Sequence, residues 1–199
     1  MSAMDRRDAV RLLALAPAAA AFRWAPESVR EAAALARETL QRGVPYEPKQ
    51  FTAREWETVR LLVDLILPKD EHSGSATEAG VPEFMDFMLG DDPNLATPIK
   101  GGLAWLDHEC DDRYGKTFTG ATDAERTAVL DDIAWPKKAK PEHAAGVAFF
   151  NGFRDLTATG FFSSKLGVQD LRYIGNTFVA EWKGCPPEAL AKLGVSYAD

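Results

Sequence analysis

The sequence predicts an all-α protein, an irregular bundle of about six helices with a long irregular C-terminal tail. Apolar residues recur at helical spacing along most of the chain, and no strand-like alternation extends over four or more residues. Two Thr-x-x-Glu capping boxes, at Thr52 and Thr122, mark helix starts. With 199 residues, 46% of them apolar, the chain can form a hydrophobic core without needing disulfide bonds or structural metal ions. We therefore expect residues 26–199 to form a single helical domain.

The first predicted helices are bounded by glycine and proline. Residues 28–41 are rich in Ala, Glu, Arg and Leu, and Gly43 ends this helix. Residues 43–48 form a rigid connector, because neither of its prolines suits a helix interior. Thr52 then caps a second helix, and Pro68 stops it. The N-terminal third is therefore predicted as two helices joined by an extended linker.

The sequence pattern in the middle of the chain predicts a loop and two more helices. Residues 69–80 are polar and rich in Ser, Gly and Glu, which is typical of a surface loop. Pro82 suits the first turn of a short helix that runs to Leu89. An apolar stripe over residues 99–114 predicts a longer helix, and Cys110 lies on that stripe. We expect the Cys110 side chain to point into the core.

The C-terminal half predicts two helices and then a loss of pattern. The helix capped by Thr122 ends near Trp135, and residues 137–140 (KKAK) form a solvated turn. Residues 143–162 form the last long helix. After Gly167 the helical period breaks down, which predicts the irregular tail.

The first 25 residues have the features of an export signal. Arg6 and Arg7 are adjacent and precede a modest apolar run followed by small Ala residues. Paired arginines indicate the twin-arginine route to the periplasm. Asp5 and Ala9 depart from the usual motif, so an amphipathic N-terminal helix that stays on the protein is the alternative. We expect residues 1–25 to be a twin-arginine-like signal segment.

Composition and motifs exclude several classes of function. The formal net charge of −7 disfavours binding to nucleic acid, because phosphate backbones would repel the chain. No apolar run reaches about 18 residues, so no membrane span is expected in the mature chain. Neither a glycine-rich phosphate loop nor a serine-nucleophile elbow is present. We therefore expect no cofactor and no catalytic residue in this chain.

Histidines provide the remaining candidates for metal chemistry. His108 and Asp112 are four residues apart on one predicted helix and could ligate a metal with a third ligand. The sequence does not locate a third ligand, and a solvated acidic face is the favoured interpretation. His72 and His143 have no nearby nucleophile, so we expect both on the surface. The sequence therefore assigns no metal site.

The tail contains the candidate residues for contact with a partner. Tyr173, Trp182 and Cys185 lie where glycines and prolines impose turns, and exposed aromatic residues often anchor partners. A tail wrapped over its own domain is the equal alternative. Cys185 and Cys110 are too few for a disulfide scaffold and too far apart for a CxxC motif. Two free thiols, one internal disulfide and one bond to another chain all stay open.

Two stretches of the chain resemble the family called gluconate 2-dehydrogenase subunit 3. The resemblance extends over residues 51–190, and its second half is the more specific because glycines, aromatic residues and Cys-Pro-Pro recur in one order. The matching segments are residues 51–55 (FTARE), 65–68 (LILP), 79–84 (AGVPEF), 160–164 (GFFSS), 170–176 (DLRYIGN) and 181–187 (EWKGCPP).

The resemblance implies a function through partners. Family members are small subunits whose large partner resembles a flavoprotein of the glucose–methanol–choline type, acting on sugars, sugar acids or polyols. FAD is then expected in the partner and haem c in a cytochrome c subunit. The small subunit would stabilise the large one and carry it through twin-arginine export to the periplasm. The alternatives are a free-standing periplasmic binding or interaction protein and an enzyme that uses the His108 cluster.

Overall fold

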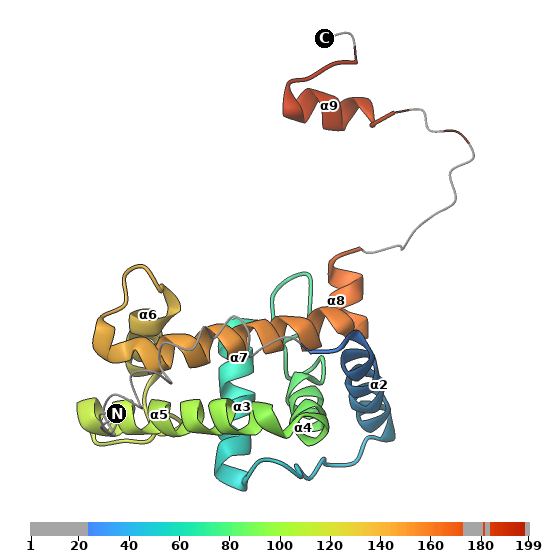
Figure 1. Cartoon of the computed structure of the whole chain (residues 1–199). Helices are drawn as coiled ribbons and strands as arrows, with labels where there is room; N and C mark the ends of the chain where they lie inside the picture. The colour runs from blue at the N-terminus through green and yellow to red at the C-terminus, as the bar shows by residue number, and fades with distance from the viewer. Residues whose placement is uncertain (1–23, 173–180, 182–183, 198–199) are drawn as a thin grey trace, which may run out of the picture.

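The computed structural model describes residues 24–172, 181 and 184–197. In this part of the chain there are eight α-helices, two 3-10 helices and no strand (Figure 1). Six of the α-helices are long, which confirms the predicted all-α bundle, and α8 and α9 are short. The elements are α2 Pro26–Arg42, α3 Ala53–Ile66, α4 Val81–Asp91, η2 Pro93–Leu95, α5 Ala96–Tyr114, α6 Asp123–Ala134, η3 Pro141–His143, α7 Ala144–Ser163, α8 Lys165–Asp170 and α9 Pro187–Leu193.

Both predicted capping boxes form and start α3 and α6. The Thr52 hydroxyl accepts the Glu55 backbone N–H at 3.3 Å, and the Glu55 carboxylate accepts the Thr52 N–H at 2.7 Å. Thr122 and Glu125 repeat both bonds at the same distances. The Thr122 backbone N–H, and then the Lys116 ammonium, lower the pKa of Glu125 to about 2. Each box satisfies donors that the first helical turn leaves unpaired.

The core lies between α5 and α7, which run lengthwise beside each other, with α3 crossing them (Figure 1). Gly102 of α5 permits this close packing, because a Cβ there would collide with the Phe149 ring of α7. Cys110 is fully buried on α5, as its place in the apolar stripe predicts. The largest fully buried side chains are Phe84, Phe118, Phe153, Leu62, Met85, Met88, Leu89, Leu95, Ile99, Leu106, Ile133 and Leu156.

Helix α2 packs on α4 through small residues. Its buried residues are Ala32 and Ala36, and it closely approaches Gly80 at the start of α4. Gly80 has a φ of +82°, and a Cβ there would lie 2.9 Å from Leu40 Cδ1. Glycine is therefore required both by the backbone conformation and by the neighbouring helix. The larger side chains of Leu35 and Leu40 stay 39% and 43% exposed.

A buried carboxylate fixes the connector between α2 and α3. Asp86 of α4 is only 2% exposed. One of its oxygens accepts the Tyr46 hydroxyl at 2.7 Å and the Lys49 N–H at 2.9 Å, and the other accepts the Gln50 N–H at 2.8 Å. Burial, and then the bond to Asp86, raise the pKa of Tyr46, so its hydroxyl stays a donor. The proline-rich connector is therefore held on the body by a side chain far away in the sequence.

Two segments differ from the sequence-based expectation. The loop before α4 is exposed in its first half, but Ser75, Ala76 and Ala79 are buried because the chain turns inward to start that helix. Helix α8 continues past Gly167, where the pattern predicted no helix. The Ser164 hydroxyl caps α8 by accepting the Gly167 N–H at 3.1 Å. None of the helices described here has the length and apolar character to cross a membrane.

Candidate functional site

The C-terminal unit, residues 184–197, contains the one candidate contact residue that the structure describes. Its helix α9 begins after Pro186 and ends at Gly194, which has a φ of +66°. The Cys185 N–H donates a hydrogen bond to the Tyr197 hydroxyl. Gly184 has a φ of +88°, and a Cβ there would lie 2.7 Å from the Tyr197 ring. The unit is therefore closed on itself by contacts between its two ends.

The C-terminal unit exposes apolar side chains. No residue of α9 is buried, and Leu193, Val195 and Tyr197 are 72%, 52% and 67% exposed. A helix of seven residues is much shorter than the roughly 12–15 residues that an isolated helix needs for marginal stability in water. A short unit with exposed apolar side chains on and after its helix is the kind of surface that a partner stabilises by covering it.

The two cysteines lie in opposite environments. Cys185 is exposed, beside the first turn of α9, and Cys110 is buried; both are free. Burial is the main cause that raises the pKa of the Cys110 thiol. Cys110 therefore behaves as a small core residue, and Cys185 is the thiol that another molecule can reach.

The other sequence-predicted site residues lie outside the described residues. These are Arg6 and Arg7 in the N-terminal segment, and Tyr173 and Trp182 in the tail. The signal segment, its boundary at residue 25, and the contact role of the two aromatic residues therefore stay predictions. Cys185 is the one candidate within the described residues, so whether the candidates lie together also stays untested.

The polar residues around His108 on α5 do not all face solvent. His108 Nε2 lies 3.6 Å from Asp112 Oδ2, and the two side chains are 72% and 65% exposed. Glu109, by contrast, is only 18% exposed and faces its neighbours. Among the described residues, no group of three or more His, Cys, Asp or Glu side chains is arranged to hold a metal ion.

The expectation that His143 lies on the surface is wrong, because this residue is only 7% exposed. The 3-10 turn η3 directs its ring inward, edge-on to Trp105 with centroids 6.1 Å apart. Its Nε2 lies 3.7 Å from Glu109 Oε1, and its buried Nδ1 has no hydrogen-bond partner in the described structure. Arg113 binds Glu109 and also Asp132 of α6. Local polarity predicted exposure, whereas packing of three helices determines the burial.

Sequence reasoning missed the exposed aromatic residue at the end of α6. Trp135 was predicted only as a helix end, yet its side chain is 61% exposed. Lys138 Nζ lies 5.6 Å from the centroid of its ring. The signal was present in the sequence as a Trp-Pro pair followed directly by lysines.

A cleft of about 300 Å³ lies where α2 meets the start of α8. Its apolar wall comes from Ala33, Leu40, Ala79 and Leu166. Arg37, Lys165 and Glu78 also line it. A cleft of this volume is at the lower limit of known small-molecule pockets.

Comparison with known proteins identifies the family. Searches of curated proteins and of solved structures returned no match. The family model described as Gluconate 2-dehydrogenase subunit 3 matches residues 53–181. This range includes α3 to α8 and therefore most of the helical body. Because the match extends over well above half of the chain, the protein belongs to the gluconate 2-dehydrogenase subunit 3 family.

Proposed function

We propose that the chain is the non-catalytic small subunit of a periplasmic, FAD-dependent dehydrogenase that acts on a sugar, sugar acid or polyol. The observation that carries the proposal is the family match over residues 53–181. Its large partner is a flavoprotein of the glucose–methanol–choline type, which holds the FAD. A cytochrome c subunit with haem c completes the complex.

The surface of the C-terminal unit supports a role in stabilising a partner. Leu193, Val195 and Tyr197 are more than half exposed, and docking would remove their apolar surface from water. Tyrosine and tryptophan are enriched among the residues that dominate protein interfaces. The predicted contact residues Tyr173, Trp182 and Cys185 belong to the same tail. We infer that this tail binds the large subunit and keeps it folded.

The N-terminal segment would supply the export signal for the complex. Arg6 and Arg7 precede an apolar, Ala-rich run, as twin-arginine signals do. This route carries folded proteins, so a partner that is already bound with its flavin can travel on the small subunit. The chain thus acts as an escort as well as a stabilising subunit.

The cleft between α2 and α8 supports a second candidate, a free-standing periplasmic binding protein. Its apolar wall and charged side chains would suit a small amphipathic ligand. A ligand that purifies with the chain in the absence of any second protein would favour this alternative.

Purification of the tagged chain from its native cells, followed by mass spectrometry and flavin absorbance, tests the proposal. We expect a large flavoprotein to copurify and the flavin to belong to that partner. Leu193→Glu should weaken copurification, whereas the control Val44→Glu, at a residue 63% exposed in the connector, should not. A chain that purifies alone, or that carries about one flavin without a second protein, would overturn the proposal.

A further inference from the structure

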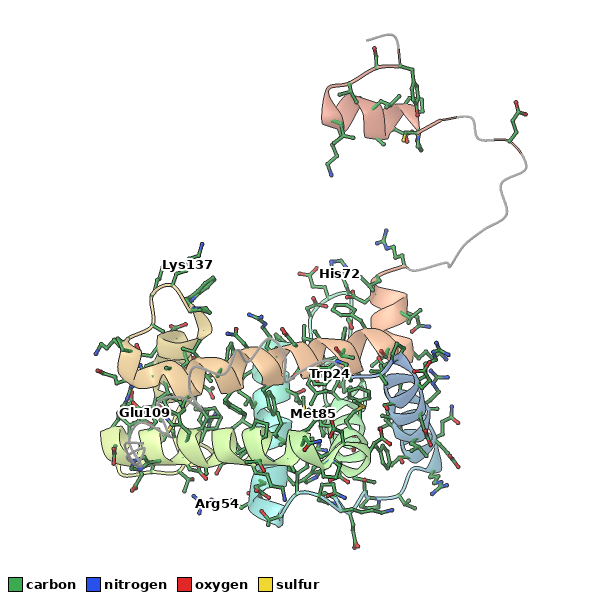
Figure 2. The ribbon with its side chains drawn as sticks, in the orientation of Figure 1. Trp24, Arg54, His72, Met85, Glu109 and Lys137 are labelled. Atoms are coloured by element: carbon green, nitrogen blue, oxygen red, sulfur yellow. The ribbon has the colours of Figure 1, made fainter. Side chains whose placement is uncertain are left out.

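The turn between α6 and η3, residues 135–140, combines an exposed tryptophan with a cluster of lysines. We call it the Trp135 turn. Trp135 is 61% exposed, and Lys137 and Lys138 follow it at exposed positions. Figure 2 shows Lys137 at the tip of the turn, pointing away from the helices. In a chain with a net charge of −7, this is a local concentration of positive charge.

Two backbone hydrogen bonds close the Trp135 turn. The Trp135 carbonyl accepts the N–H of Lys138 at 2.8 Å and that of Ala139 at 3.0 Å. Pro136 has no N–H to satisfy. These bonds give the turn a defined backbone conformation from which its side chains project.

The charges around the turn leave its tip positive. Lys140 is paired with Glu142 at 3.7 Å, and Asp132 is paired with Arg113 at 2.7 Å. Asp131 is exposed on α6, before the turn. The ammonium groups of Lys137 and Lys138 have no carboxylate partner among the described residues, although Lys138 lies over the Trp135 ring.

We propose that the Trp135 turn is a contact site for an anionic lipid surface. Tryptophan concentrates at the level of lipid headgroups, where its ring meets the apolar chains and its N–H meets water. Lysines near such a surface are attracted by anionic headgroups. The projecting tip combines an exposed tryptophan with two lysines that have no carboxylate partner among the described residues, which is the combination that an anionic headgroup layer attracts. An acidic protein surface is the other occupant, and the experiment below separates the two.

The expected contact is weak and depends on salt. Each lysine near an anionic surface strengthens binding about fivefold, so Lys137 and Lys138 together account for about 30-fold. Insertion of Trp135 adds about tenfold. The acidic body opposes binding, but charges farther than about 8 Å are screened at physiological ionic strength. The site adds to any attachment through partners and does not depend on the proposed dehydrogenase function.

Sedimentation of the purified full chain with vesicles tests the site without any partner. Vesicles in which about one lipid in three is phosphatidylglycerol are compared with vesicles of pure phosphatidylcholine. Both are measured at low and at physiological salt concentration. Lys137→Gln with Lys138→Gln should reduce the partition coefficient about 30-fold, and Trp135→Ala about tenfold. The matched control is Lys49→Gln with Lys165→Gln, which removes two exposed lysines elsewhere.

Each outcome of this experiment is decisive. The site is supported if only the substitutions in the Trp135 turn lower the partition coefficient on anionic vesicles and the control variant stays within about threefold of the native chain. Equal losses in both double variants would show a net-charge effect and overturn it. Equal binding to neutral vesicles would also overturn it. Vesicle binding that stays unchanged in the Lys137 and Lys138 double variant would overturn it as well and leave an acidic protein as the occupant of the turn.

Discussion

Asp86 offers the most direct test of how this fold is held together, because one buried carboxylate fixes a distant connector. It accepts three hydrogen bonds, from the hydroxyl of Tyr46 and the backbone N–H groups of Lys49 and Gln50. At 2% exposure the carboxylate itself is shielded from bulk water. We expect Asp86→Ala to destabilise the protein strongly.

The magnitude follows from the number and type of the lost bonds. A hydrogen bond to a charged group contributes about 1.5–3 kcal/mol. The connector lies at the surface, so its freed donors regain some water, and we expect a loss of about 3–4 kcal/mol for Asp86→Ala. Asp86→Asn keeps one acceptor oxygen and should cost about 2 kcal/mol, and Tyr46→Phe about 1 kcal/mol. These losses are large beside a typical total stability of about 5–15 kcal/mol.

Urea unfolding followed by circular dichroism measures these differences, and Glu83 provides the matched control. Glu83 also lies buried on α4, at 5% exposure, but its Oε2 has no hydrogen-bond partner in the described structure. Burial raises its pKa above the usual 4.5, so its ionisation should lower stability as the pH rises above that value. Glu83→Gln should therefore be at least as stable as the native protein at pH 7 and lack this pH dependence. A loss below about 1 kcal/mol for Asp86→Ala would refute the anchoring argument.

Three further predictions concern packing, export and the tail. Gly102→Ala should cost about 2 kcal/mol in urea unfolding by overpacking the α5–α7 contact. The control Gly101→Ala meets open space and should not destabilise, and equal effects would contradict the packing argument. Replacing both Arg6 and Arg7 with Lys should trap the chain in the cytoplasm, and full periplasmic yield on fractionation would exclude twin-arginine export. Cys185 should be free or bonded to the large subunit on non-reducing gels, and an internal disulfide in peptide maps would refute its place at the interface.

The helix boundaries could be predicted because their signals are local. The capping boxes at Thr52 and Thr122 involve residues only three apart, so the sequence contains both partners of each bond. Gly43 ends α2 in the left-handed conformation that glycine favours. The burial of Cys110 followed from its place on an apolar stripe. In each case the determining contacts lie within one helix or its ends.

The features that could not be predicted depend on contacts between elements. His143 is polar and has charged neighbours in the sequence, yet packing against Trp105 buries it. The partners of Asp86 lie 36–40 residues away, and no local pattern reveals them. The exposure of Trp135 likewise depends on which helices cover the end of α6. Of the candidate site, the sequence located Cys185 in the tail but not the turn around Trp135.

The shielded charges of Asp86 and Arg126 serve the fold, and this constrains where the functional contacts can lie. Asp86 holds the connector, and Arg126 donates to the backbone carbonyls of Phe118 and Thr119, in the loop before α6. The exposed side chains of Leu193, Val195 and Trp135 have no comparable role in the fold. Substitutions at Asp86 or Arg126 should therefore lower the free energy of unfolding and all binding together. Substitutions at the exposed positions should change binding while urea unfolding stays unaltered, which separates interaction surfaces from the scaffold by experiment.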